Sequence, residues 1–285
     1  MKHKRTRRLG FYGAIAALVL LQVWIFVGHY YRYPFEKQFE PWHDGITLNE
    51  VDEGYPHIRS ESDTFSEELY ESVRSVKDAV VYLRARYDLS DDEAVLKGVY
   101  ELVSNRYIHF MYPHFTWLTN PYLSLVEKVV PEKPYNGMYL ADDMLRHSAA
   151  GGCGNTATTF IEIYRALGRE AQFVELPGHD VAEAVAGGKK WLVDPDMGGI
   201  APQSVADINM QTDLLDGIYK HQGHKVGRLK EMFRSDRIVE YGYDSLPTAS
   251  PRIYRAQQVI GIAKWMVVPA LIALLILMRR RILPD

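Results

Sequence analysis

Two long apolar runs, one near each end of the chain, constrain its fold more than any other feature. The first spans 10–28 and holds Gln22 as its only strongly polar side chain. The second spans 259–278 and is interrupted only by Lys264. A helix rises about 1.5 Å per residue, so each run can cross a hydrocarbon core of roughly 30 Å. We therefore expect two transmembrane helices, with the long Lys264 side chain reaching one membrane interface.

Basic residues beside the two runs predict the orientation of these helices. Five of them precede the first run and three follow the second, in the tails 1–9 and 279–285. Because positive flanks stay on the cytoplasmic side, both tails should be cytoplasmic and 29–258 extracytoplasmic. A cleaved signal peptide is the alternative for the first run, but the run is long and no small-residue cleavage site follows it. The expected location is the inner (plasma) membrane.

The region between the runs is acidic and holds the only cysteine. The whole chain has 33 basic and 36 acidic residues. Setting aside the tails and Lys264 leaves 24 against 35, a net charge of about −11. Such a charge argues against nucleic acid or bare anionic lipid as a ligand of this region. The single Cys153 excludes an internal disulfide, so its thiol needs another explanation.

The outer region divides into three parts. Residues 29–63, rich in Tyr, Pro and charge, are expected to form an irregular lead-in. A folded domain is expected over 64–240, and a linker over 241–258 leads to the second apolar run. We find no internal repeat or low-complexity tract in the sequence.

Capping patterns and apolar spacing predict the helices of the first half of the domain. Thr64 followed by Glu67 opens a helix whose apolar stripe runs over 69–83, and Ser90 opens a second helix in the same way. Residues 107–137 hold many aromatics and prolines without a clean period, which indicates a long loop. A short helix is expected over 138–147.

The second half of the domain predicts a buried helix followed by strands. Gly151-Gly152-Cys153-Gly154 signals a turn, and 156–167 is apolar almost all round, with Gly168 in position to end the helix. Three short segments typical of strands follow, at 171–176, 180–186 and 190–193. Helices followed by antiparallel strands indicate an α+β fold.

Cys153 lies at or just before the N-terminus of the buried helix, a position with chemical consequences. A helix N-terminus lowers a cysteine's pKa through its unpaired N–H groups, and the thiolate is the attacking species. The same N–H groups could stabilise an oxyanion on an attacked carbonyl. The alternative is that Cys153 is only a small buried apolar residue, as most lone cysteines are.

The hairpin expected between 180–186 and 190–193 separates these alternatives. If Gly187 and Gly188 form a two-residue turn, paired positions sum to 375, and His179, Asp194 and Asp196 point to one face of the sheet. His179 and Asp194 are then diagonal neighbours within reach of each other. A helix-cap cysteine with this pair matches a nucleophile, a base and an orienting carboxylate, so we predict the catalytic residues Cys153, His179 and Asp194.

The segments GGCGNTATTFIEIYRALGREAQFVEL and GHDVAEAVAGGKKWLVDPD resemble the transglutaminase-like domain of bacterial and archaeal proteins. The resemblance is close over 150–196 and looser over 64–105. It covers neither apolar run nor residues 200–258. It implies a papain-like core, a buried cysteine-bearing helix packed on an antiparallel sheet, with Cys153, His179 and Asp194 as nucleophile, base and third member. The sequence departs from the family pattern where His179 lacks a following Ala-Trp pair and where Asp196 replaces Thr or Ser.

The sequence leads to two hypotheses about function. The first is a membrane-anchored thiol acyl-transfer enzyme, a peptidase, amidase or transglutaminase-type enzyme, acting on an extracytoplasmic protein or peptide such as a cell-wall peptide stem. The second is a mainly non-catalytic anchored subunit of an envelope or polysaccharide-assembly complex, with other envelope proteins as partners. Neither requires a cofactor or nucleic acid. The histidines match no strong ligand pattern, so no metal is expected; these are His109, His114, His221 and His224.

An aromatic run between Tyr107 and Tyr122 leaves three interpretations open. It could line a groove for sugars or peptides, pack its loop on the core, or rest at the membrane interface, where Tyr and Trp accumulate. We favour packing on the core. The charged stretch 225–237 is expected to be a solvated helix.

Overall fold

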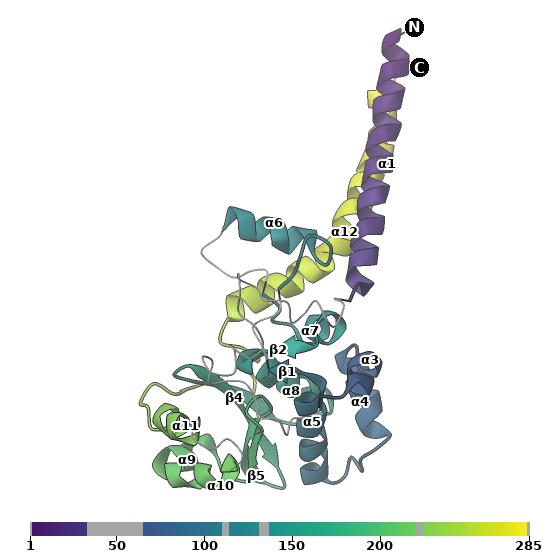
Figure 1. Cartoon of the computed structure of the whole chain (residues 1–285). Helices are drawn as coiled ribbons and strands as arrows, with labels where there is room; N and C mark the ends of the chain where they lie inside the picture. The colour runs from purple at the N-terminus through teal and green to yellow at the C-terminus, as the bar shows by residue number, and fades with distance from the viewer. Residues whose placement is uncertain (1, 33–64, 110–113, 131–136, 221–224, 284–285) are drawn as a thin grey trace. The chain divides into compact units, whose positions relative to one another are not determined.

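The computed structural model describes residues 2–32, 65–109, 114–130, 137–220 and 225–283. These residues form two compact units (Figure 1). One unit comprises Met1–Tyr31, His114–Gly137 and Arg255–Asp285, and the other comprises Arg32–Pro113 and Met138–Tyr254. Thr64 and most of the lead-in expected over 29–63 lie outside the described residues, as do His221 and His224.

The second unit is α+β, as the sequence predicts. Its helices are α3 (Glu67–Ser72), α4 (Val76–Arg84), α5 (Asp92–Arg106), α7 (Ala141–His147), α8 (Cys153–Ala166), α9 (Val205–Met210), a 3₁₀ turn (Thr212–Leu214), α10 (Leu215–Ile218) and α11 (Lys225–Phe233). Its strands are β1 (Ile108–His109), β2 (Ala150–Gly151), β3 (Ala171–Leu176), β4 (His179–Ala186), β5 (Lys189–Asp194), β6 (Gly199–Ala201) and β7 (Val239–Glu240).

The main sheet has the strand order β6-β5-β4-β3-β7, and every neighbouring pair is antiparallel. Gly187 and Gly188 form the turn between β4 and β5, with φ of 57° and 72°. Two consecutive residues with positive φ are what a tight two-residue hairpin requires, which explains both glycines. Ala186 pairs with Lys189 and Ala182 with Val193, so the register is the one that the sequence predicts.

Both faces of the sheet are covered. Val174, Val181 and Leu192 point to one face and belong to a buried cluster with side chains of α9, α10 and α11. Phe173 and Ala182 point to the opposite face of the sheet and are also buried. On that evidence helices lie on both sides of the sheet, and α8 contacts β3 and β4 directly (Figure 1).

Several helices differ from the sequence prediction. The single helix expected over 69–83 is broken into α3 and α4, because Ser75 leaves the helix and its side chain caps the N–H of Asp78. Asp91, one residue after Ser90, caps α5. The loop expected over 107–137 contains β1 and α6 (Pro121–Val129), and α11 is amphipathic, with Leu229 and Phe233 buried.

The break between α3 and α4 coincides with a buried arginine. The Arg106 guanidinium is fully buried and donates to the backbone oxygens of Val73, Leu145 and Ser148 at 3.2, 2.7 and 3.0 Å. A continuous helix would use the Val73 carbonyl within itself, so this contact favours the break. Burial lowers the pKa of Arg106 to about 10, which still leaves it charged at neutral pH.

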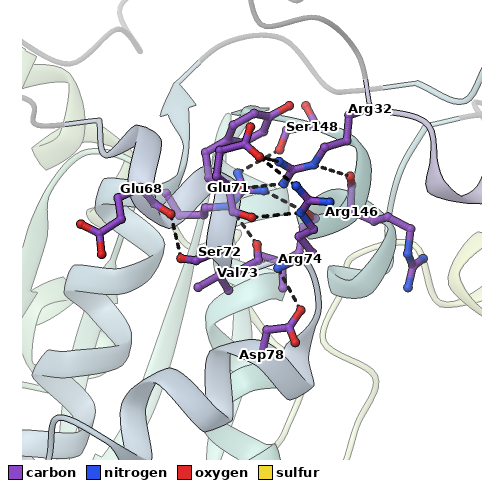
Figure 2. Close-up of polar contacts among 12 residues, drawn as sticks. Arg32, Glu68, Glu71, Ser72, Val73, Arg74, Asp78, Arg146 and Ser148 are labelled. Carbon is purple, nitrogen blue, oxygen red and sulfur yellow. Dashed lines mark hydrogen bonds and ion pairs between the residues drawn. The ribbon is translucent and has the colours of Figure 1, made fainter.

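A second arginine lies beside the same helices (Figure 2). Arg32 pairs with Glu71 at 3.0 Å and donates to the backbone oxygen of Arg146 at 3.2 Å. Its guanidinium also lies 4.1 Å from the centre of the Tyr70 ring, whose backbone oxygen it contacts. These contacts join Arg32 to both α3 and α7.

The first unit is built from α1 (Lys2–Tyr30), α6 and the greater part of α12 (Pro251–Ile282). Among the described residues, two helical stretches are long and apolar enough to cross a membrane, Arg8–Tyr30 and Pro251–Arg279. Both are longer than the apolar runs from which we predicted them. The segment expected as a linker to residue 258 thus already belongs to α12 from Pro251 onward.

Lys264 contacts the other apolar helix. Its side chain is buried. The Nζ atom lies 3.3 Å from Nδ1 of His29 on α1 and 5.7 Å from the centre of the Trp265 ring. The amine therefore joins the two apolar helices to each other.

Candidate active site

The turn before α8 holds Cys153 in a fixed position. The Asn155 side chain accepts a hydrogen bond from the N–H of Gly152 at 3.1 Å and donates to the backbone oxygen of Met138 at 2.7 Å. The preceding strand β2 pairs in parallel with β1. Cys153 is the first residue of α8, so its side chain projects from the first turn of a helix whose leading N–H groups have no carbonyl of a preceding turn.

His179 and Asp194 form a direct hydrogen bond. The distance from His179 Nε2 to Asp194 Oδ2 is 2.8 Å, and both side chains are fully buried. A carboxylate only accepts, so Nε2 carries the proton of this bond. The two residues lie on neighbouring strands and point to the same face, the arrangement that the two-glycine turn predicts. The other ring nitrogen, Nδ1, is thereby available to the thiol.

The Asp194 carboxylate has further donors. The Tyr219 hydroxyl, at the end of α10, donates to Oδ2 at 2.8 Å, and the backbone N–H groups of Asp196 and Met197 donate to Oδ1 at 3.2 and 3.0 Å. Tyr219 reaches Asp194 because Gly199 has no side chain: a Cβ there would lie 2.3 Å from the Tyr219 ring. Hydrogen bonds to both of its oxygens therefore hold the carboxylate in one orientation.

The thiol completes this group. The side-chain ligand atoms of Cys153, His179 and Asp196 all lie within 4.8 Å of one another. The Cys153 Sγ also lies 3.8 Å from Oδ2 of Asp180. The structure thus brings together Cys153, His179 and Asp194, the three residues selected from the sequence, with two further acidic residues around the sulfur.

The charges of the group follow from burial and from its neighbours. Burial raises the pKa of the Cys153 thiol, and the opposing effect of His179 does not cancel it. The sequence predicted the opposite direction, because it considered only the helix N-terminus. Burial alone would lower the pKa of His179, but the Asp194 carboxylate raises it well above its ordinary value. The same pairing overcomes burial and keeps the pKa of Asp194 low.

The Asp180 carboxylate, beside the sulfur, also has a shifted pKa. Burial raises its pKa to about 6, although the charge of His179 acts in the opposite direction. At neutral pH Asp180 therefore carries a negative charge beside the sulfur, and this charge opposes formation of the thiolate.

The same atoms could serve a metal ion. Cys153, His179 and Asp196 would supply a sulfur, a nitrogen and an oxygen, which is a donor set suited to zinc. A proton shared between the thiol and the imidazole needs the same proximity. The positions of the atoms fit both a bound metal ion and a proton shared by the thiol and the imidazole. Treatment with EDTA distinguishes the two.

Sequence reasoning missed two contributors to this site. Tyr219 lies 25 residues after Asp194, in a stretch without a clear apolar period. The signal that could have found it is Gly199, a glycine in a short strand, which often marks a close approach. Asp180 follows His179 directly in the sequence, and its contact with the sulfur depends on where α8 meets β4.

The fold and the site define an α+β protein in which a partly buried thiol lies next to a buried imidazole, which in turn is bonded to a buried carboxylate. Comparison with protein-family models, with curated proteins and with solved structures gives no match.

Proposed function

We propose that this chain is a membrane-anchored thiol acyl-transfer enzyme that acts on a protein or peptide outside the cytoplasm. Cys153 is the nucleophile, His179 moves the proton and Asp194 orients the imidazole. The observation that carries the proposal is the 2.8 Å bond between His179 Nε2 and Asp194 Oδ2, in an imidazole that lies within 4.8 Å of the only thiol of the chain. This is the relation that a nucleophile, base and orienting group require.

The arrangement of elements supports a papain-like or transglutaminase-like core. The cysteine is the first residue of a buried helix, α8, which contacts the antiparallel strands β3 and β4. The histidine and the aspartate come from β4 and β5 of that sheet. The resemblance over 150–196 assigns the same roles to the same three residues.

In the first half of the reaction, His179 Nδ1 takes the proton of the Cys153 thiol. The sulfur forms a bond to the carbonyl carbon of an amide or ester, and N–H groups at the start of α8 face the developing oxyanion. As the intermediate collapses, the bond to the leaving amine or alcohol breaks. The leaving group takes the proton from the imidazolium, and the acyl group remains on the sulfur.

In the second half, a new nucleophile releases the acyl group. Water or a primary amine gives its proton to His179 and forms a bond to the acyl carbon. The carbon–sulfur bond then breaks and the proton returns to the sulfur. Water gives a peptidase or amidase, whereas an amine gives crosslinking of the transglutaminase type. A glutamine-containing peptide assayed for ammonia release and for amine incorporation separates these two outcomes.

The buried Asp194 stays ionised, so the imidazole is the group that gains and loses a proton. Both of its oxygens accept hydrogen bonds, and its pKa is lowered, so it stays charged while the imidazole gains and loses its proton. A fixed negative charge beside the ring stabilises the imidazolium that forms in each half of the reaction. Tyr219 is a positioning residue, since it touches the carboxylate and not the thiol.

Membrane anchoring is the second part of the proposal. The apolar helical stretches Arg8–Tyr30 and Pro251–Arg279 would both cross the bilayer, with the basic tails in the cytoplasm and the domain outside. Val81 is an exposed position on α4, so a thiol introduced by Val81→Cys in a Cys153→Ser chain reports on which side of the membrane the domain lies. We expect an impermeant maleimide to label it on intact cells. Labelling only after the membrane is broken would overturn this orientation.

An activity-based thiol probe tests the catalytic part. The purified full chain should be labelled at Cys153, Cys153→Ala should abolish labelling, and His179→Gln should reduce it strongly while the chain remains folded by circular dichroism. His114→Ala, which removes a histidine outside the site, should change nothing. Labelling that is indifferent to His179→Gln would instead favour a mainly non-catalytic anchored subunit, because the thiol would then be only an accessible sulfur.

A further inference from the structure

The helix α6 exposes apolar side chains where a helix on a water-exposed surface carries polar ones, although Lys128 is exposed beside them and Leu123 is buried. Leu125 and Val129, one turn apart, are 52% and 73% exposed. Ser124 is only 7% exposed, and the Oε2 atom of Glu127 is buried. A helix on a soluble protein turns its apolar stripe inward and its charged side outward. The outer side of α6 is therefore suited to an apolar environment.

The segment before α6 touches α1 at the end of a candidate membrane span. The Trp24 indole N–H donates to the backbone oxygen of Trp117 at 3.1 Å. Gly28 of α1 packs against Leu118, the residue after Trp117. A Cβ at Gly28 would lie 1.7 Å from the Leu118 backbone oxygen. Trp24 precedes the last residue of α1, Tyr30, by about 9 Å along the axis, at about 1.5 Å per residue. The segment thus meets α1 inside the apolar stretch.

The exposed apolar surface continues from α6 into this segment. Trp117 and Val130 are also exposed, and the Lys128 Nζ lies 5.0 Å from the centre of the Trp117 ring. A tryptophan with a lysine beside it is typical of the boundary between lipid and water, because each has an apolar body and a polar tip. Scattered apolar residues need no explanation, but neighbouring ones beside an apolar helix do.

We propose that α6, with Trp117, lies in the membrane interface and that Leu125, Val129 and Val130 contact lipid acyl chains. The occupant of this surface is the bilayer itself, because the surface is continuous with the apolar stretch of α1, within one compact unit. The inference rests on the membrane-anchoring part of the proposed function and is independent of the catalytic group. An interfacial helix of this kind buries its apolar side several ångströms below the headgroups.

The single cysteine makes a direct test practical. A Cys153→Ser chain has no thiol, so Leu125→Cys and Val129→Cys each introduce one site for a nitroxide spin label in the full chain in lipid nanodiscs. Two matched controls use exposed apolar residues elsewhere. Leu20→Cys on α1 reports the bilayer interior, and Val81→Cys on α4 reports water. Power-saturation EPR measures access to oxygen, which dissolves in lipid, and to a nickel chelate, which stays in water.

We expect labels at 125 and 129 to favour oxygen over the chelate, as the label at 20 does, and the label at 81 to show the reverse. Labels at 125 and 129 that behave like the one at 81 would overturn the inference while leaving the anchors intact. Protection from both reagents would indicate a protein contact, such as a second copy, and would also overturn it. Chelate access at 20 would overturn both the inference and the anchoring on which it rests.

Discussion

The charge of Asp180 gives the sharpest quantitative test of the site. Its Oδ2 lies 3.8 Å from the Cys153 sulfur, so a thiolate formed there faces a like charge whenever Asp180 is ionised. Asp180→Asn removes this charge and keeps the size of the side chain. We expect the variant to have a lower thiol pKa, and therefore a more reactive Cys153, than the native chain.

The size of the effect follows from the distance. Two unit charges about 4 Å apart at an effective dielectric constant near 20 interact by about 4 kcal/mol. Since one pKa unit corresponds to about 1.4 kcal/mol, the upper limit is about 3 units, and neighbouring charges shift a pKa by about 1–3 units in general. Asp180 also attracts the charge of His179, which works in the opposite direction and keeps the change below that limit.

The reactivity change is smaller than the change in thiolate fraction. Each unit of pKa gives about tenfold more thiolate, but intrinsic nucleophilicity falls with a Brønsted slope of about 0.4–0.5. The net gain is about threefold per unit, so alkylation at pH 8 should be about 3- to 30-fold faster in the variant. Because the pKa of Asp180 is about 6, the charge is present above that pH and lost below it. The ratio of the two rates should therefore fall toward one as the pH drops below about 5.

The assay is the rate of iodoacetamide alkylation of the full chain in nanodiscs between about pH 4.5 and 8.5. The chain has one cysteine, so every alkylation event reports on Cys153. Asp236→Asn, at an exposed position away from the sulfur, is the matched control and should leave the rate unchanged. Equal rates for Asp180→Asn and the native chain at pH 8, or a ratio that does not vary with pH, would refute the reasoning.

Three further outcomes are expected. Tyr219→Phe removes a buried hydrogen bond to the charged Asp194, so unfolding of the domain should be easier by about 1.5–3 kcal/mol in thermal denaturation, and an unchanged midpoint would contradict this. Arg106→Met leaves three buried carbonyls without their donor and should cost about 3 kcal/mol or more, whereas Arg74→Met at an exposed position should cost little. Treatment with EDTA should leave the labelling of Cys153 unchanged; faster labelling after EDTA would show that the thiol holds a metal ion.

The strands and the His179–Asp194 pair could be predicted because they depend on local rules. Side chains alternate strictly along a strand, and the two adjacent glycines allow one tight turn. Register and face follow from those two facts, and β3 begins and ends at the predicted residues. The position of Cys153 at the start of α8 was predictable for a similar reason, since glycines precede a stretch with apolar residues on nearly every side of the helix.

Other features could not be predicted because they depend on contacts between distant residues. The apolar stripe over 69–83 continues through the break at Val73, and the contact that favours the break besides the Ser75 cap comes from Arg106, 33 residues away. Tyr219 could not be predicted for the same reason, since Asp194, which it contacts, lies 25 residues earlier in the chain. The direction of the Cys153 pKa depends on how much protein covers the sulfur, and a sequence shows the helix N-terminus but not that cover.

The turn at Gly187 and Gly188 has a consequence for how this chain can vary. Surface loop tips usually accept insertions and deletions. Here a single added residue would reverse which face of β5 each following side chain occupies, and Asp194 would turn away from His179. Length changes at this tip should therefore come in pairs, or with a compensating bulge, wherever the histidine and the aspartate remain joined. A small exposed turn thereby limits which length variants can keep the buried ring in place.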